Sequence, residues 1–431
     1  MSHKIDAKQI NKRLNLYTID TQKFKTDLIG VYIKRKLSSK EAAYNTLITR
    51  ILSRGTKKYP SGKILQNKLD ASYGMILVSD VVKQGSYHIL QFRLQFPNHK
   101  HIQEQFIFEE ALDLLHEVIF KPLADENGFD PHIFIQEKNN LLDEIRSREN
   151  DKMSFALDRC IEHMFEGEGY GQYVYGDEKT VEAIEAHDLY KHYLELLESS
   201  LFDICIMGDL KDKSIGQSVE KYFPVKENDY VDYMIRETHE AHFQLKTIKE
   251  SQAIKEGKLV MGFRTYINHT EPLYEASVLA YHILGGGPSS ILFHRLREDE
   301  SLCYYVYAKS DKYKGALFIG AGIDPNDLEV VTGHVFEVIE TLKKEGVSQS
   351  TLDDTANAMV DSIHALSDFS NAFMNFLYGE LLGKSVDHVV EISEIVQGYK
   401  NVSVEDIKAV FDKLKPDLIY LLHGDEDDIL Q

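Results

Sequence analysis

The chain has 431 residues, of which 43% are hydrophobic and 27% are charged, and its formal net charge is -20. This composition indicates a soluble globular protein of two or three domains, and its acidity argues against nucleic acid as a standing partner. The first residues lack an apolar segment, and no run approaches the ~18 apolar residues of a membrane span. The three cysteines are widely spaced, which suits a reducing compartment. We therefore expect a cytoplasmic protein with no membrane partner.

Helix and strand patterns alternate along the first half of the chain. Apolar residues at helical spacing predict a short helix over residues 44–52, which Gly55 follows. Strict alternation of apolar and polar residues predicts a strand over residues 89–96. Helical spacing then predicts one helix over residues 106–120 and another that begins near Pro131 and runs past Ile145.

An internal repeat organises the chain. The segment "DICIMGDLKD" resembles "DLIYLLHGDEDD", and their Gly-Asp ends begin at Gly208 and Gly424, which are 424 − 208 = 216 residues apart. Upstream helix starts at Asp188 and Asp406 are 406 − 188 = 218 residues apart. This near-constant offset predicts two related halves, residues 1–225 and 251–431, joined by a linker over residues 226–250. We expect an α+β fold in which each half is a mixed β-sheet with helices packed on one face.

A glycine-rich stretch stands out in the second half. It reads "LGGGPSSILFHRLREDESLCYYVYA" from Leu284 to Ala308. Its three glycines, Gly285 to Gly287, can adopt positive φ angles and let the backbone approach a ligand closely. An amphipathic helix start and a tyrosine-rich strand are predicted to follow. Taken alone, the stretch fits a structural turn as well as a binding loop.

This stretch resembles the second domain of the pitrilysin/insulinase-type zinc peptidases, which include the mitochondrial processing peptidase. The matching positions are Gly286, Ser289, Ser290, Leu292, Leu296, Arg297, Glu298, Leu302 and Tyr304. In the first half, "RGTKKYPSG", "EKNNLLDEI" and "EGYGQYVYGDEKTVEAI" follow in the family's order. The resemblance runs from about Leu28 to Asp425.

The family's zinc motif is degenerate here. Active members carry His-x-x-Glu-His before a Gly-Thr loop, with two histidine ligands and a glutamate base. The corresponding stretch is Thr46 to Arg50, so Thr46 and Arg50 replace the two histidines and Thr49 replaces the base. Glu137 and Glu144 remain on the later helix, and Glu144 aligns with the family's third ligand. One carboxylate is a poor zinc site, so we expect no cofactor and an ion pair between Arg50 and Glu144.

The family's second catalytic element is present. Arg297 and Tyr304 match, in position and in their spacing of 304 − 297 = 7, an Arg/Tyr pair that contacts the substrate carbonyl and the developing oxyanion. The resemblance implies a catalytic role for this pair in trans, and substrate binding by Gly285, Gly286, Gly287, Ser289 and Ser290. In the structural alternative, Arg297 pairs with a neighbouring acid and Tyr304 packs between sheet and helix.

The resemblance therefore implies a non-zinc subunit of a heterodimeric peptidase. A paralogous partner would carry the zinc, and the substrate would be a peptide or an unfolded polypeptide. One alternative is a structural or chaperone-like relative, as the core subunits of the respiratory ubiquinol–cytochrome c reductase are. The other is a homodimer that binds peptides without cleaving them.

Overall fold

The computed structural model describes residues 4–102, 106–210, 214–228, 244–384, 386 and 388–424. The chain forms two compact units, each of which combines segments that are distant in the sequence. Unit 1 contains Met1–Ser147, Gln172–Ile235 and Ser367–Val390, and unit 2 contains Arg148–Gly171, Arg236–Leu366 and Glu391–Gln431. Residues 229–243 of the predicted linker and the repeat's Asp425 lie outside the described residues. No helix among those residues is long and apolar enough to cross a membrane.

Unit 1 is built on a six-stranded mixed sheet in the order β1-β2-β8-β3-β5-β4. Strands β2 and β8 run parallel, and the other neighbouring pairs are antiparallel. The strands are β1 (Lys4–Asn11), β2 (Leu14–Asp20), β3 (Thr26–Lys36), β4 (Ile76–Gln84), β5 (Tyr87–Pro97) and β8 (Leu201–Gly208). The helices are α1 (Ser39–Leu52), α2 (Gly62–Ala71), α3 (Ile107–Phe120), α4 (Pro131–Ser147), α6 (Glu178–Ala183), α7 (Ala186–Ser199), α8 (Ile215–Tyr222) and α12 (Ser370–Leu381).

Unit 2 is built on a five-stranded mixed sheet in the order β11-β12-β10-β13-β9, in which β13 and β9 run parallel. The strands are β9 (Lys246–Ser251), β10 (Gly257–Arg264), β11 (Cys303–Asp311), β12 (Ala316–Ile323) and β13 (Lys415–His423). The helices are α5 (Lys152–Met164), α9 (Tyr274–Gly285), α10 (Leu328–Glu345), α11 (Gln349–Leu366), α13 (Ile392–Lys400) and α14 (Val404–Lys413). Strand β9 begins inside the range predicted as linker, because an edge strand with mostly exposed side chains reads as a polar segment.

The local predictions agree with these elements. The strand predicted over residues 89–96 is β5, and its alternating residues Leu90, Phe92, Leu94 and Phe96 are buried in the core of unit 1. The helices predicted over residues 106–120 and from Pro131 are α3 and α4. The two repeated strands are β8 and β13, each an interior strand of its sheet. The predicted fold class, two related α+β halves with mixed sheets, is confirmed.

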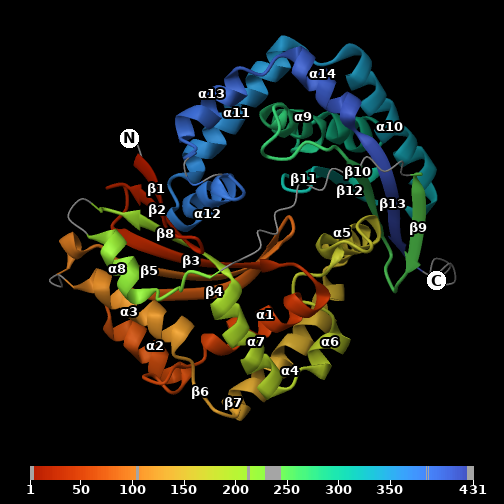
Figure 1. Ribbon diagram of the computed structural model, residues 1–431. Coiled ribbons are helices and arrows are strands. Elements are labelled where there is room, and N and C mark those ends of the chain that lie inside the picture. The colour runs from red at the N-terminus through yellow and green to blue at the C-terminus, as the bar shows by residue number, and fades with distance from the viewer. Residues whose placement is uncertain are drawn as a thin grey trace. The chain divides into compact units, whose positions relative to one another are not determined.

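Each unit also contains one helix from the other half of the sequence. Helix α12 packs against β8 in unit 1, and α5 packs against β10 and β13 in unit 2. In Figure 1, α12 is blue among the red and orange strands of unit 1, and α5 is yellow beside the teal and blue strands of unit 2. The exchanged segments, Arg148–Gly171 and Ser367–Val390, begin 367 − 148 = 219 residues apart, close to the repeat offset. The two helices are therefore equivalent elements of the duplication.

The exchanged helix of unit 1 is held by a buried ion pair in the sheet. Lys34 Nζ of β3 lies 2.7 Å from Asp203 Oδ2 of β8, and both side chains are buried. The hydroxyl of Tyr378 in α12 donates to the same Asp203 oxygen over 2.9 Å. The Tyr378 ring also stacks on Tyr32, with 3.8 Å between the ring centroids. Because each charge has a partner, burial of the pair is tolerated and α12 is fixed to the sheet.

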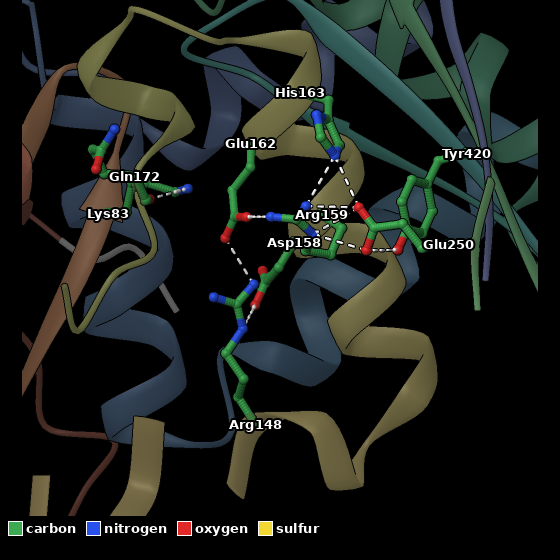
Figure 2. Close-up of polar contacts among 9 residues, drawn as sticks. All are labelled: Lys83, Arg148, Asp158, Arg159, Glu162, His163, Gln172, Glu250 and Tyr420. Atoms are coloured by element: carbon green, nitrogen blue, oxygen red, sulfur yellow. Dashed lines mark hydrogen bonds and ion pairs between the residues drawn. The ribbon is translucent and has the colours of Figure 1, made fainter. Parts of the chain in front are cut away.

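Unit 2 repeats this arrangement with different residues. Arg264 Nε of β10 lies 2.7 Å from Asp417 Oδ2 of β13, and Arg264 Nη2 donates to the backbone carbonyl of Met164 at the end of α5. Figure 2 shows a second carboxylate, Glu250 of β9, that binds the same helix. Arg159 Nη2 and His163 Nε2 lie 2.6 Å and 3.0 Å from Glu250 Oε1.

The hydroxyl of Tyr420 in β13 donates to the other oxygen of Glu250 over 2.9 Å. Burial by itself would raise the pKa of Glu250, but the hydrogen bonds from Arg159, His163 and Tyr420 outweigh it and lower this pKa to about 2. Glu250 therefore stays ionised and keeps its attraction for α5.

Replacing Tyr378 by Phe should loosen α12 without unfolding unit 1. The change removes one hydrogen bond to a charged group, which is worth about 1.5–3 kcal/mol, so amide hydrogen exchange in residues 370–381 should accelerate about 10- to 150-fold. The matched control is Tyr73→Phe, because the Tyr73 side chain is 52% exposed. Equal exchange rates in α12 for the two variants would contradict this role of Tyr378.

Candidate functional site

Helix α1 carries the positions that correspond to the family's zinc motif. It begins after Ser38, whose hydroxyl accepts a hydrogen bond from the backbone N–H of Glu41 over 3.2 Å. Its apolar face buries Leu47, Ile48 and Ile51 in the core of unit 1, as the sequence pattern predicts. The opposite face therefore presents Thr46, Thr49 and Arg50 toward α4 and β4.

A buried polar network supports α1 from below. The side chain of Asn45 lies 3.2 Å from His88 Nδ1 of β5 and 3.2 Å from His192 Nε2 of α7. Burial lowers the pKa of His88 to about 4, so its imidazole is neutral at physiological pH. Burial would raise the pKa of Glu41, but hydrogen bonds from His192 and Arg35 lower it to about 2. The network fixes the axial rotation of α1.

The two threonines make local hydrogen bonds. The hydroxyl of Thr46 donates to the carbonyl of Ala42 over 2.7 Å, and that of Thr49 donates to the carbonyl of Asn45 over 2.8 Å. Both side chains are about 2% exposed. Each hydroxyl thus satisfies its donor on the preceding turn of α1, as threonine commonly does inside helices.

Two ion pairs connect the C-terminal end of α1 to α4. Arg50 Nη2 donates to Glu144 Oε2, which is the pair that the sequence predicts. Arg54 Nε, just beyond the helix, lies 2.7 Å from Glu137 Oε1. The Arg50 guanidinium also lies over the ring of Tyr175, 5.7 Å from its centroid. The two acids left from the family's pattern are therefore both paired with arginine.

These residues do not fit a zinc ion. A zinc site needs three or four ligands, each of them neutral or deprotonated. Here Glu144, which aligns with the third ligand, instead contacts the permanently charged guanidinium of Arg50. Within the described part of the chain, no cluster of three or more His, Cys, Asp or Glu side chains could hold a metal.

A cavity of about 410 Å³ opens where the metal site would be. Helix α1 contributes Thr46, Thr49 and Arg50, α4 contributes Glu137, and the edge strand β4 contributes Leu77 to Val81. Asp80 of β4 is exposed and accepts one hydrogen bond, from the Val81 N–H over 2.8 Å, and partial desolvation in the cavity raises the pKa of its carboxyl. The cavity is polar and lies entirely within unit 1.

Arg297 and Tyr304 lie on either side of a tight turn in unit 2. Arg297 belongs to a π-helix, η4 (Phe293–Asp299), and Tyr304 is the second residue of β11. Between them Ser301 has a positive φ of 54°, and the N–H of Leu302 donates to the carbonyl of Leu296 over 2.7 Å. This backbone hydrogen bond fixes the turn, and with it the Cα positions from which the two side chains extend.

Both side chains are exposed. Tyr304 is 74% exposed, and its hydroxyl has no hydrogen-bond partner among the described residues. Arg297 is also exposed, lies over the ring of Phe293 at 4.8 Å from the centroid, and forms no ion pair with a described residue. The structural alternative, with Arg297 paired to an acid and Tyr304 packed between sheet and helix, is therefore wrong within the described residues.

The glycine-rich loop shows mainly packing. A Cβ atom on Gly285 would lie 2.7 Å from the Cβ of Ala308 in β11, and one on Gly286 would overlap the ring of His282. Gly287 has a φ of 151° and open space around it. Ser289 is exposed, whereas the Ser290 hydroxyl is buried without a hydrogen-bond partner. Packing explains the first two glycines, and substrate binding by the loop stays a prediction.

Sequence reasoning missed the residues that β4 and Arg54 contribute to the cavity. Strand β4 lies next to α1 through tertiary packing alone, so no motif in "ILVSDVVKQ" marks Ser79 or Asp80. The single available signal was Asp80 itself, an acid in an otherwise β-prone run. The amphipathic helix predicted after the glycines is the π-helix η4. The spacing of apolar residues does not distinguish a π-helix from an α-helix.

The natural chain should not bind zinc at α1, whereas the variant Thr46→His/Thr49→Glu/Arg50→His should bind about one zinc per chain. Two imidazoles one helical turn apart, together with Glu144, restore three ligands. Elemental analysis after dialysis against zinc and then buffer measures the metal content. Stoichiometric zinc in the natural chain, with Arg50 in place, would contradict the role given to Arg50.

Unit 1 should lose stability as the pH falls from about 6.5 to 4. His88 has a pKa of about 4 when folded and 6.5 as its ordinary value, so the unfolded chain binds a proton that the folded chain excludes. The loss is on the order of 3 kcal/mol, and the contribution of Glu41 is lost between about pH 4.5 and 2, so it overlaps only the acid end of this range. Urea unfolding at stepped pH measures the slope.

The variant His88→Gln should flatten this pH dependence, because glutamine keeps a hydrogen-bonding side chain and does not titrate. The matched control is His132→Gln, since His132 is exposed. If the natural chain and His88→Gln show the same slope between pH 6.5 and 4, His88 is not the responsible group.

Comparisons with known proteins agree with this geometry. A family model described as "Peptidase M16 inactive domain" matches residues 183–359. A Bacillus subtilis protein named "Probable inactive metalloprotease YmfF" is 28% identical over 428 residues, which are 99% of each chain.

Solved structures share the fold along the whole chain. A conserved protein from Enterococcus faecalis has a TM-score of 0.87 and 23% identity, over 98% of this chain and 99% of that one. A chain of Complex III2 from Candida albicans has a TM-score of 0.72 and 14% identity, over 99% and 97%. The chain is therefore similar to the M16 peptidases, including a relative named as an inactive metalloprotease, and Thr46, Thr49 and Arg50 stand on α1 where that family's zinc motif would lie.

Proposed function

We propose that this chain is the non-zinc subunit of a two-chain peptidase and that it supplies Arg297 and Tyr304 in trans to a zinc-bearing paralogue. The observation that supports this most directly is that both side chains are exposed on a fixed turn and have no polar partner within the described residues. A guanidinium and a phenol are hydrogen-bond donors, and donors are what a developing oxyanion requires. Structural arginines usually pair with an acid.

The surroundings of the pair support a preorganised element. Leu296 is fully buried and Cys303 is 7% exposed, so the two ends of the turn are anchored in the core of unit 2. Phe293 holds one face of the Arg297 guanidinium and leaves its N–H edges available. A group that is already positioned costs no reorganisation when charge develops, which is why such donors accelerate acyl transfer.

The substrate in this proposal is a peptide or an unfolded polypeptide, and the location is the cytoplasm. The relatives' names, which describe an inactive metalloprotease and a peptidase's inactive domain, fit a chain without its own zinc chemistry. The isolated chain would be a monomer or a homodimer without peptidase activity.

A structural role is the second candidate. The observation that favours it is the shared fold with a chain of Complex III2. Under this alternative Arg297 and Tyr304 would be ordinary surface residues, and their replacement would leave any activity of the assembly unchanged.

Arg297→Ala or Tyr304→Phe in this chain should lower the peptidase kcat of a mixture with the zinc-bearing paralogue. Loss of one oxyanion donor typically costs about 100- to 1,000-fold in kcat. The assay uses the co-purified pair with the partner saturating, and each chain alone serves as the blank.

Arg295→Ala is the matched control, because Arg295 lies on the same π-helix but its guanidinium already pairs with Glu300 at 3.2 Å. The proposal requires full activity for this control. Unchanged turnover in both test variants would instead favour the structural role.

A further inference from the structure

The cavity at α1 contains a buried carboxylate oxygen with no partner. Glu137 is 1% exposed and lines the cavity. Its Oε1 atom lies 2.7 Å from Arg54 Nε and accepts from Asn140 Nδ2 over 3.2 Å. Its Oε2 atom is buried and has no hydrogen-bond partner. A charged acceptor in this state is costly, so it is suited to a donor that enters the cavity.

A second acceptor and unused donors lie on the same cavity. Asp80 accepts its one hydrogen bond from the neighbouring backbone, and its side chain forms no ion pair with any described residue. Arg54 is half exposed and contacts Glu137 through Nε, so its two Nη groups are available. Leu77 and Val81 of β4 add apolar surface to the wall.

The balance of charge decides which ligand suits these groups. Two guanidinium groups, on Arg50 and Arg54, face three carboxyls, on Glu137, Glu144 and Asp80. A simple cation would be repelled by both arginines, and a simple anion would be repelled by the unpartnered oxygen of Glu137. A molecule that carries both charges can satisfy both kinds of group, and charge-assisted hydrogen bonds are the strong ones.

We propose that this cavity binds a zwitterionic α-amino acid. The ammonium group donates to Glu137 Oε2 and to the Asp80 carboxylate, the α-carboxylate accepts from the Nη groups of Arg54, and the side chain lies on Leu77 and Val81. A volume of about 410 Å³ is sufficient for a small molecule of this size. The site uses residues of unit 1 alone and is independent of the function proposed for Arg297 and Tyr304.

Calorimetric titration of the full chain with each of the twenty proteinogenic amino acids tests the proposal. L-leucine has two matched analogues, isopentylamine without the carboxylate and 4-methylpentanoate without the amine. We expect at least one amino acid to bind, and its two single-charge analogues to bind at least about tenfold more weakly. Absence of binding by every amino acid up to about 10 mM, or equal binding by either analogue, would overturn the proposal.

Variants locate the site. Glu137→Gln should weaken binding at least about tenfold, and Glu126→Gln, which changes an exposed turn residue of unit 1, should leave it unchanged. Because Glu137→Gln also removes the partner of Arg54, Asp80→Asn serves as a second variant that breaks no ion pair and should weaken binding as well. Amino-acid binding that survives both Glu137→Gln and Asp80→Asn would place the ligand elsewhere and refute the site.

Discussion

One buried basic–acidic pair in each unit determines how the rest of the chain can pack. Lys34 with Asp203, and Arg264 with Asp417, join a strand from the start of each half to the strand that closes it. Burying such charges is expensive, and it is compensated only when every remaining lone pair and N–H finds a partner. Tyr378 and the Met164 carbonyl provide those partners, and both come from the exchanged helices. The pair and the exchange therefore depend on each other.

The two units share a buried ion pair but differ in the residues at their candidate sites. In unit 1 the pairs Arg50–Glu144 and Arg54–Glu137 connect α1 to α4 where a metal ion would otherwise join them. They keep the helices in place but offer no Lewis acid. In unit 2 the turn that carries Arg297 and Tyr304 shows no such substitution, and its donors remain exposed. Ion pairs thus occupy this position in unit 1, whereas unit 2 presents exposed hydrogen-bond donors.

Sequence patterns predicted individual helices and strands, but they did not predict which elements pack against one another. The alternation in β5 and the spacing in α3 reflect which side chains are buried, so the sequence alone was sufficient. The Arg50–Glu144 pair followed from alignment with a known motif. The exchange of α5 and α12 left no local signal, because a helix has the same periodicity whichever sheet it covers. The β4 side of the cavity and the buried Gly285–Ala308 contact arise in the same way from residues far apart in sequence.

The exchange of helices also determines when unit 1 can finish folding during synthesis. Unit 1 includes Ser367–Val390, so the buried acid Asp203 lacks its tyrosine partner until the ribosome has added Tyr378, and unit 1 is complete only at residue 390. Between residues 235 and 390 lie 390 − 235 = 155 residues, which take about 8–31 s at the usual elongation rates of about 5–20 residues per second. During this interval α12 is not yet available to pack against β8. Neither half of the gene therefore encodes a complete folding unit.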